Sequence, residues 1–187
     1  MPGWPNFDHW FPPIEPAERR PTPGYGLRHP AEDEHGRLLA LATGWFEQPT
    51  LHPVLPRLLL REMATVSWLA ETAKGRTIGL LLGLVGPDRP GEAAIVLVGV
   101  HPELRRRGIG RALVERFVAD AGAGGIGRVV AAIRTDDRVT LAFFAALGFE
   151  PDAGPGSSRI RGLAAFADWD GPGQDRVLMV HEMAAGR

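Results

Sequence analysis

Cysteine is absent from this chain of 187 residues, and tyrosine and lysine occur once each, as Tyr25 and Lys74. Without cysteine the chain can form no disulfide bond, no thiolate metal site and no cysteine nucleophile. No apolar run approaches the ~18 residues that a transmembrane helix needs. A charged start followed by an apolar core and a small-residue cleavage site is also missing. We therefore expect no signal peptide, no membrane partner and a cytoplasmic location.

An excess of charge of either sign is missing as well. The 21 basic and 22 acidic side chains leave a net charge of −1, whereas nucleic-acid binders usually carry a basic excess. We therefore expect no nucleic-acid partner. H-E-x-x-H, clustered histidines with ligand spacing and G-x-S-x-G do not occur, so we expect neither a metal site nor serine-hydrolase chemistry. The chain length and the apolar fraction of 44% predict one main globular domain with a substantial core.

The start of the chain differs in composition from the rest. Residues 1–25 contain seven prolines, beside the aromatic side chains of Trp4, Phe7, Trp10 and Phe11. So much proline excludes a regular helix or a central strand, and the aromatic content is high for a flexible tail. We expect an extended arm that packs on its own domain or on a second subunit of a homodimer, with a disordered leader as the alternative. Residues 26–187 would form the main domain.

The most informative stretch runs from residue 94 to residue 121. Residues 94–100 are apolar and rich in β-branched side chains, which predicts a buried strand, and from Gly108 the apolar residues recur four apart, which predicts a helix. Between them, residues 105–111 read R-R-R-G-I-G-R. No Ser, Thr, Asp or Asn is present to cap the first N–H groups of the helix, and glycine lets a ligand approach the backbone. This junction predicts a phosphate-binding loop; the alternative is a solvated basic turn before an ordinary amphipathic helix.

Two segments resemble one known family. V-G-V-H-P-E-L-R-R-R-G-I-G-R-A-L, residues 98–113, is similar to the coenzyme A loop of the GNAT superfamily of N-acetyltransferases. The family signature is Arg or Gln, two residues, Gly, one residue, then Gly or Ala, and it matches Arg105, Gly108 and Gly110. D-R-V-T-L-A-F-F-A-A-L-G-F, residues 137–149, resembles the family's N-x-x-A-x-x-F-Y-x-x-L-G-F helix.

The order of elements expected from the residues matches the GNAT fold over about residues 24–184. We expect an α/β protein with a mixed, mostly antiparallel central sheet of six to seven strands, flanked by about four helices. In that fold the fourth and fifth strands are parallel and splay apart, with the cofactor's pantetheine in the opening. The expected strands are 26–29, 66–72, 77–85, 94–100, 128–133, one from 149, and 176–183. The expected helices are 31–44, 51–63, 108–121 and 137–147.

Two glycine-rich segments need separate interpretation. Residues 122–127 formally satisfy G-x-G-x-x-G, but they follow a helix and precede a strand, which is the reverse of a dinucleotide fingerprint. We interpret these glycines as the end of the helix and a turn. Residues 151–174 hold five glycines and three prolines, and we expect a long loop with one short extended segment near residues 159–163.

The resemblance implies a function and a site. It implies acetyl-CoA as the acyl donor and an N-acetyltransferase reaction on a small amine, with the loop amides on the pyrophosphate and the strand backbone on the pantetheine. The cofactor-binding positions that it implies are Val98, Gly99, Val100, Arg105, Arg106, Arg107, Gly108, Ile109, Gly110, Arg111, Asp137, Phe143 and Phe144.

The chain departs from the family at three positions. Asp137 stands where many members have an asparagine, and Phe144 stands where many have a tyrosine thought to protonate the departing thiolate. Ala94 stands where members with a carboxylate base have that base. Phenylalanine cannot donate a proton, so water or another group takes that role or activity is lost. The alternative function is therefore a catalytically inert acyl-CoA-binding or sensing protein of the same fold.

Other side chains are candidates for the general base. Glu92 lies two residues before Ala94, on the same face of the strand, and is the first candidate. Glu71 and Asp170 are weaker candidates. The alternative for Glu92 is an ordinary surface residue at a strand end, and the alternative for the segment around Asp170 is a structural turn. His101, between a strand and a proline, is interpreted as a turn residue.

Overall fold

The computed structural model describes residues 24–46 and 55–183. The arm expected over residues 1–25 lies almost wholly outside the described residues, as do residues 51–54 of the second expected helix. The described chain divides into two compact units. Among the described residues, the larger unit comprises those from 24 to 132 and those from 180 onward, and the smaller unit comprises Ile133–Met179. Each unit is described by itself.

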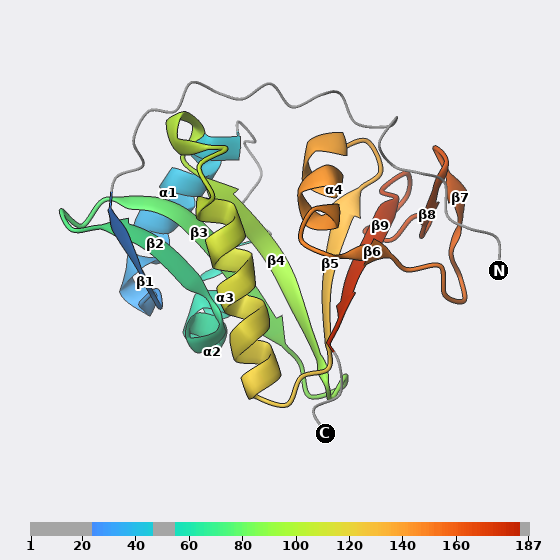
Figure 1. The fold of residues 1–187 in the computed structure, drawn as a ribbon, viewed down its shortest axis with the longest axis horizontal. Coiled ribbons are helices and arrows are strands. Elements are labelled where there is room, and N and C mark those ends of the chain that lie inside the picture. Colours follow the sequence, from blue (N-terminus) through green and yellow to red (C-terminus); the bar gives the residue numbers. More distant parts are fainter. Residues whose placement is uncertain (1–23, 47–54, 184–187) are drawn as a thin grey trace. The chain divides into compact units, whose positions relative to one another are not determined.

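The larger unit contains most of the central sheet and three of the four α-helices (Figure 1). Its elements are β1 (Tyr25–Arg28), η2 (Glu32–Glu34), α1 (His35–Phe46), α2 (Arg57–Met63), η3 (Ala64–Val66), β2 (Trp68–Thr72), β3 (Thr77–Val85), β4 (Glu92–Val100), η4 (Pro102–Leu104) and α3 (Ile109–Ala123). Strands β5 (Arg128–Arg134) and β9 (Arg176–Glu182) each begin in one unit and end in the other. The smaller unit adds α4 (Arg138–Ala145), β6 (Glu150–Pro151), β7 (Ser158–Ile160) and β8 (Leu163–Ala165).

The central sheet has seven strands in the order β1-β2-β3-β4-β5-β9-β6. The first four strands pair antiparallel in chain order. β4 and β5 are parallel, and their ladder joins residues 92–94 to residues 128–130. The parallel pair follows from the connection, because α3 crosses between the two strands and returns the chain to the same end of the sheet. The expected mixed, mostly antiparallel sheet with four helices is confirmed.

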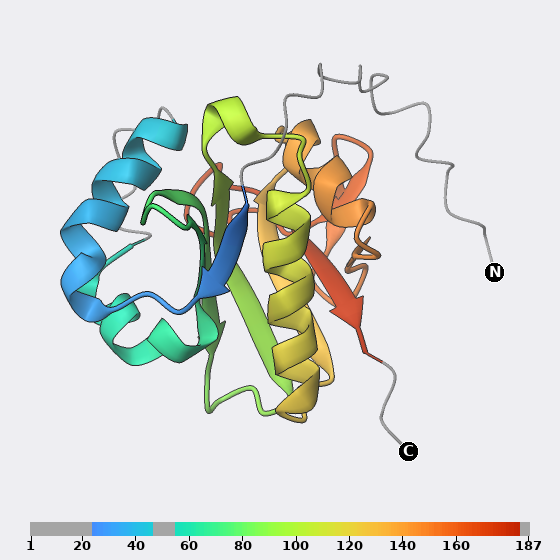
Figure 2. The ribbon, with the colours of Figure 1, turned by 60° about the vertical axis from the view of Figure 1, so that its left-hand side comes forward.

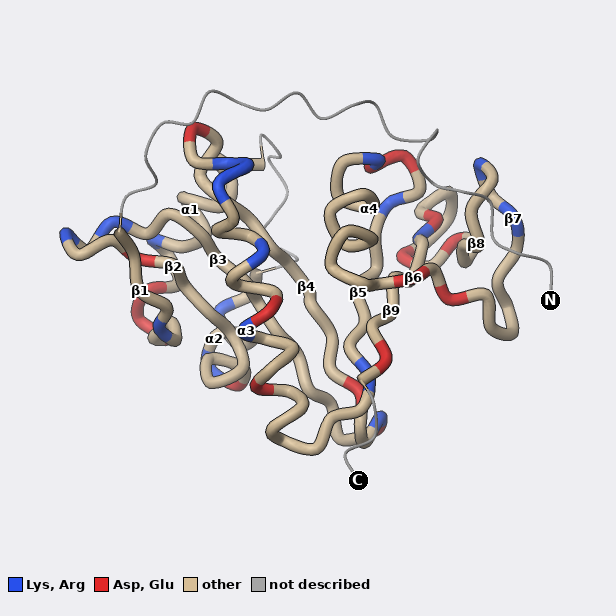
Figure 3. The backbone as a smooth tube through the Cα atoms, viewed as in Figure 1, with Lys and Arg blue, Asp and Glu red and all other residues tan. Residues whose placement is uncertain are grey.

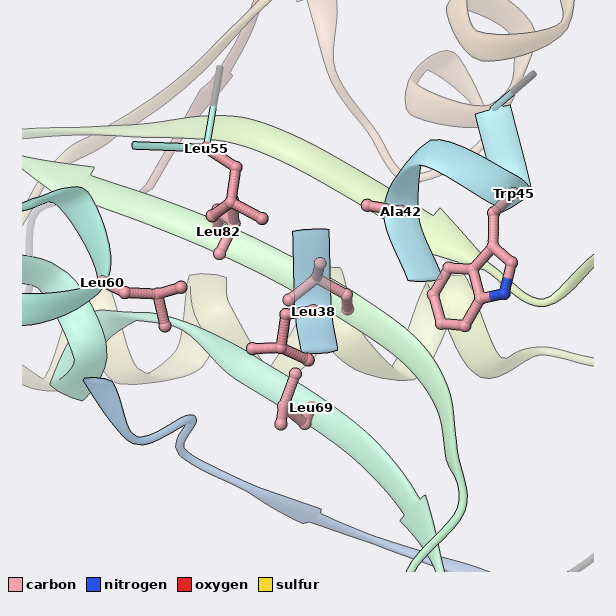
Figure 4. Close-up of a cluster of buried hydrophobic side chains, with 8 residues drawn as sticks. Leu38, Ala42, Trp45, Leu55, Leu60, Leu69 and Leu82 are labelled. Carbon is pink, nitrogen blue, oxygen red and sulfur yellow. The ribbon is translucent and has the colours of Figure 1, made fainter. Parts of the chain in front are cut away.

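Helices cover both faces of the strands β2 to β4 (Figure 2). On one face α1 and α2 bury a cluster of apolar side chains against the sheet, formed by Leu38, Ala42, Trp45, Leu55, Leu60, Leu69, Leu80 and Leu82 (Figure 4). On the other face α3 lies close to β3, because Gly79 and Gly83 leave room for it. A β-carbon at Gly79 would lie 2.8 Å from Ile109, and one at Gly83 would lie 2.3 Å from Phe117. These two glycines therefore set the height of α3 above the sheet.

The two N-terminal helices begin later than expected. The helix predicted over residues 31–44 opens with the 3-10 turn η2, and α1 proper runs from His35 to Phe46. The Glu34 carboxylate accepts the Ala31 N–H at 2.9 Å and closes this first turn. The second helix begins at Arg57 because Pro56 disfavours helical geometry at the residue before it.

The structure confirms the turn predicted after α3 and corrects the prediction for the loop of residues 151–174. α3 ends at Ala123 and Gly125 has φ of +81°, so the glycines at 122–127 form a turn, as predicted. The single extended segment expected near residues 159–163 is wrong, because β7 and β8 form a two-stranded hairpin there. Arg161 and Gly162 occupy the turn with φ of +50° and +86°. Two consecutive positive φ angles are the geometry of a tight hairpin turn, which an Arg-Gly pair signals only weakly.

An ion-pair network joins β1, the start of α1 and β2. Arg28 Nη1 lies 2.7 Å from the Glu34 carboxylate, and Arg28 Nη2 lies 2.6 Å from the Glu71 carboxylate. Arg37 also pairs with Glu34. The hydrogen bond from Arg28 lowers the pKa of Glu34 to about 2, and the same guanidinium lowers the pKa of Glu71.

This network predicts a pH dependence of stability. Because the folded pKa of Glu34 is below its unfolded value, the contribution of Glu34 is fully present above pH ~4.5 and is lost as the pH falls toward ~2. We expect Glu34→Gln to lower the free energy of unfolding by about 1–2 kcal/mol at pH 7, a figure discounted for the partial exposure of the pair. Urea unfolding at a series of pH values measures this difference, which should shrink below pH ~4. Glu62→Gln, at an exposed pair with Arg61, should change stability by less than about 0.5 kcal/mol.

Candidate cofactor-binding site

The loop that follows β4 is held to the neighbouring strand. The His101 N–H donates to the Ile78 carbonyl of β3 at 3.0 Å, and the Leu104 N–H donates back to the His101 carbonyl at 2.8 Å. The Arg105 N–H then donates to the Pro102 carbonyl at 3.3 Å, which closes the short turn η4. The chain therefore leaves β4 in a defined direction and reaches α3 within a few residues.

Open backbone N–H groups mark the start of α3. Gly108 is the N-cap, with φ of +82° and no side-chain cap, and the first amide bonded into the helix is that of Ala112. In the part of the chain that the structure describes, the amides of Arg106, Gly108, Ile109 and Gly110 have no protein acceptor. A β-carbon at Gly108 would have nothing within 4 Å. A helix start with free donors and open space above its backbone fits an anionic group such as a phosphate.

The arginines of the loop, which gather in Figure 3 at the turn before α3, have different environments. Arg105 donates to the main-chain carbonyls of Trp45 and Val100, at 2.5 and 3.3 Å. Arg107 donates to the Glu103 carbonyl at 3.0 Å. Arg111 pairs with the carboxylate of Glu115, one turn further along α3, at 3.1 Å.

Arg106 differs from these three. Its side chain is exposed, it has no bonded partner among the described residues, and its φ is +64°. A left-handed conformation at a non-glycine residue costs of order 1 kcal/mol. The resemblance grouped the four arginines together, and only the structure separates them.

β4 contains a β-bulge that the sequence did not reveal. Leu82 of β3 pairs with Leu97 of β4, and the next residue, Gly83, pairs with Ile95, so that Val96 is one residue too many on β4. A bulge leaves the extra residue unpaired and bends its strand, and bulges are common beside active sites. An apolar β-branched run carries no compositional mark of an inserted residue, so the pattern could not have predicted it.

The strand positions implied to bind pantetheine lie after this bulge. Gly99 is buried under the ring of Phe46, the last residue of α1, and a β-carbon at Gly99 would lie 2.5 Å from Phe46 Cζ. Val98 and Val100 flank it and are half-buried. Binding of a cofactor by these three residues stays a prediction.

The helix α4 of the smaller unit contains the other three implied positions. The Asp137 carboxylate accepts the Thr140 N–H at 3.0 Å and the Thr140 hydroxyl at 2.7 Å. It therefore caps α4, as predicted from the run before the helix. Phe144 is 1% exposed, and its ring meets those of Phe143 and Phe149 edge to face, with centroids 5.3 and 5.0 Å away. Contact of Asp137, Phe143 and Phe144 with a cofactor stays a prediction.

The three candidate bases are all bound to arginines. Glu92 lies 3.2 Å from Arg128 Nε and 3.7 Å from Arg89. Glu71 is held by Arg28, as described above, and Asp170 lies 2.8 Å from Arg176. Glu92 is also the first residue of β4, and the eight residues to Val100 span roughly 26 Å of strand. A catalytic role for these carboxylates stays a prediction, and the ion pairs give each a structural role.

His101 is placed at the exit of β4, where it caps η4. Its Nε2 lies 2.8 Å from Arg76 Nη2. Because a guanidinium only donates, Nε2 accepts and the proton is assigned to Nδ1, which is buried without a hydrogen-bond partner in the described chain. The ring also meets Trp45 edge to face at 6.1 Å. These contacts support the interpretation of His101 as a turn residue.

In residues 24–46 and 55–183, no cluster of three or more His, Asp or Glu side chains could hold a metal ion. Within the same ranges, none of the helices has the length and apolar character required to cross a membrane.

Comparison with known sequences points to one family. The model of the Acetyltransferase (GNAT) family matches residues 28–149. A mycothiol acetyltransferase from Saccharomonospora viridis is 28% identical over 136 residues, which cover 65% of this chain and 44% of that protein. The chain spans less than half the length of the curated relatives that it matches.

Comparison with solved structures points to the same fold. Ard1 from Thermoplasma volcanium superposes with a TM-score of 0.68 at 19% identity, over 86% of this chain and 98% of that one. The PaiA N-acetyltransferase from Thermoplasma acidophilum, solved in complex with coenzyme A, superposes with a TM-score of 0.63 at 13% identity, over 85% and 99% of the two chains.

Proposed function

This chain belongs to the GNAT acetyltransferase family, and from that premise we propose that it is an acetyl-CoA-dependent N-acetyltransferase acting on a small amine. The observation that carries the proposal is the start of α3. There, four open amides and the bare backbone of Gly108 form a cradle for a pyrophosphate. A cytoplasmic location and a homodimer belong to the same proposal and are testable by fractionation and light scattering.

The residues of the larger unit would bind and orient the donor. The amides of Arg106, Gly108, Ile109 and Gly110 would donate to the pyrophosphate oxygens, and the Arg106 guanidinium would neutralise part of the pyrophosphate charge. Main-chain groups of Val98 to Val100 would pair with the pantetheine amides, and a β4 N–H would polarise the thioester carbonyl. Bound acetyl-CoA supplies a thioester-activated acetyl group. The chain contributes chiefly by holding donor and amine together in a reactive geometry.

The loss of the amine proton needs a separate assignment. Glu92, Glu71 and Asp170 are all held by arginines, and Phe144 has no proton to give. We therefore assign the proton transfers to water in this proposal. The same facts favour the second candidate, an inert acyl-CoA-binding or sensing protein.

Two experiments separate these candidates. Calorimetry with coenzyme A and with acetyl-CoA tests the binding that both candidates require, and absence of binding at high micromolar ligand would contradict both. Release of the free thiol from acetyl-CoA, followed across a panel of small amines, tests turnover. Turnover with any amine rules out the inert protein, whereas tight binding with no turnover across the panel supports it.

The role of Glu92 can be tested by conservative substitution. We expect Glu92→Gln to lower the free energy of unfolding by about 1 kcal/mol, because it removes the ion pair between Glu92 and Arg128. We expect kcat/KM to change by less than about twofold, since a general base would contribute about 10²–10⁴-fold. Chemical denaturation and steady-state kinetics on the same preparation measure the two effects. A loss of kcat in that range with unchanged stability would place the base at Glu92.

A further inference from the structure

The last turn of α1 has no basic residue of its own. The final four carbonyls of a helix have no partner inside it and carry partial negative charge, which a cation at this end would stabilise. In this chain the cation comes from the cofactor loop. Arg105, which is 60 residues away in sequence, donates from Nη2 to the Trp45 carbonyl at 2.5 Å.

The same guanidinium also reaches the end of β4. Arg105 Nε donates to the carbonyl of Val100, the last residue of that strand, at 3.3 Å. One planar side chain therefore joins the end of α1, the end of β4 and the loop that leads to α3. All of these residues belong to the larger unit.

Two further contacts lie beside this junction. The ring of Phe46 covers the α-carbon of Gly99, and the ring of Trp45 meets His101. The last two residues of α1 therefore contact the end of β4 and the first residue of the loop, and Arg105 supplies the polar part of that contact. Arg106, one position later, has no such bond in the described chain.

We propose that Arg105 is a positioning residue, which anchors the cofactor loop to the C-terminal turn of α1 and sets the open amides of Arg106, Gly108, Ile109 and Gly110 before any ligand binds. Its effect on coenzyme A binding rests on the proposed function, but the anchoring does not. The two neighbouring arginines therefore have different roles in this proposal. Arg105 holds the loop through two main-chain carbonyls, and Arg106 meets the charge of the ligand.

The anchoring is tested in the full chain without ligand. Amide hydrogen exchange is followed by mass spectrometry on peptides that cover residues 37–46 and 98–111, in the wild type, Arg105→Gln and Arg106→Gln. Both variants lose one positive charge, so that they are matched. We expect exchange in both peptides to rise about tenfold in Arg105→Gln, the loss expected for hydrogen bonds from a charged donor. We expect no change in Arg106→Gln. Equal exchange in the wild type and Arg105→Gln would overturn the proposal.

The division between the two arginines is tested with coenzyme A as the probe. Calorimetric affinities are measured at several salt concentrations, because loss of a phosphate-neutralising charge flattens the salt dependence. We expect Arg105→Gln to bind coenzyme A about tenfold more weakly than the wild type, with the same salt dependence of the affinity. We expect the affinity of Arg106→Gln to depend less steeply on salt than that of the wild type. A flattened salt dependence in Arg105→Gln would make Arg105 a phosphate ligand and overturn the proposal.

Two controls keep the outcomes separate. Arg105→Lys keeps the charge but can reach fewer acceptors than the guanidinium fork, so its exchange should fall between the wild type and Arg105→Gln. If Arg105→Gln does not fold, Arg105→Lys against the wild type carries the same test. If the wild type does not bind coenzyme A, the proposed function fails, and the exchange experiment still decides whether Arg105 anchors the loop.

Discussion

Replacing Gly108 with leucine is expected to abolish coenzyme A binding while the fold survives. The φ of Gly108 is +82°, and a β-carbon there would meet nothing within 4 Å. The leucine side chain would therefore find no steric conflict inside the protein. It would instead fill the space above the open amides, where a phosphate has to approach the backbone.

The expected magnitudes differ for the two properties. The left-handed conformation should cost about 1–2 kcal/mol of stability for a non-glycine residue. Loss of several hydrogen bonds to a charged group should weaken binding by at least about 100-fold. Denaturant unfolding and calorimetry with coenzyme A, on the same protein, measure these two effects.

Gly125 provides a matched control for Gly108. Its φ is +81° and a β-carbon there would also meet nothing within 4 Å, but it follows the other end of α3. Gly125→Leu should cost the same stability and leave the affinity for coenzyme A unchanged. If both variants lose affinity equally, strain rather than obstruction explains the effect, and the position of the cradle at Gly108 is wrong.

Gly83→Ala is expected to cause a large loss of stability. A β-carbon at Gly83 would lie 2.2 Å from the Val66 carbonyl oxygen and 2.3 Å from Phe117 Cε2. The carbonyl belongs to the backbone and cannot rotate away, so β3, the turn at Val66 and α3 would have to separate. Overpacking typically costs about 1–3 kcal/mol, and because one clashing atom belongs to the backbone we expect a loss at the upper end of this range.

The measurement for Gly83 is urea unfolding, with Gly26→Ala as the control. Gly26 lies in β1, where a β-carbon would meet nothing within 4 Å, and its replacement should change stability by less than about 0.5 kcal/mol. The folded fraction of Gly83→Ala should also bind coenzyme A more weakly, because displacing Phe117 tilts the helix whose start forms the cradle. A Gly83→Ala protein as stable as the wild type would show that α3 does not depend on this close approach.

Most of the fold could be predicted because its signals are local. Strand β3 begins and ends where the apolar run does, at Thr77 and Val85, and α3 follows from the four-residue spacing of Ile109, Leu113 and Phe117. Errors lie where local signals are weak or compete. The helix expected over residues 31–44 begins late because the Glu34 carboxylate caps a 3-10 turn first. The hairpin of β7 and β8 was missed because Arg161 takes a positive φ that arginine rarely adopts.

The candidate site divides in the same way. The run of residues 105–111 predicted a loop at which an anion meets a helix start, since uncapped donors and glycine are visible in the sequence. The sequence did not show which of the arginines is available to bind that anion. Arg105 is bound to a carbonyl 60 positions earlier, and no local pattern records such a partner.

Taken by itself, the sequence determined the order of strands and helices, the family, and the type of ligand expected at the loop, because each depends on neighbouring residues. The tertiary structure alone decided the bulge at Val96, the ion pairs of Glu92 and Glu71, and the anchor at Arg105. Each of these depends on which distant residues the sheet and helices bring within hydrogen-bonding distance. The charge and polarity of a side chain are known from the residue type, but its bonding partner depends on the fold.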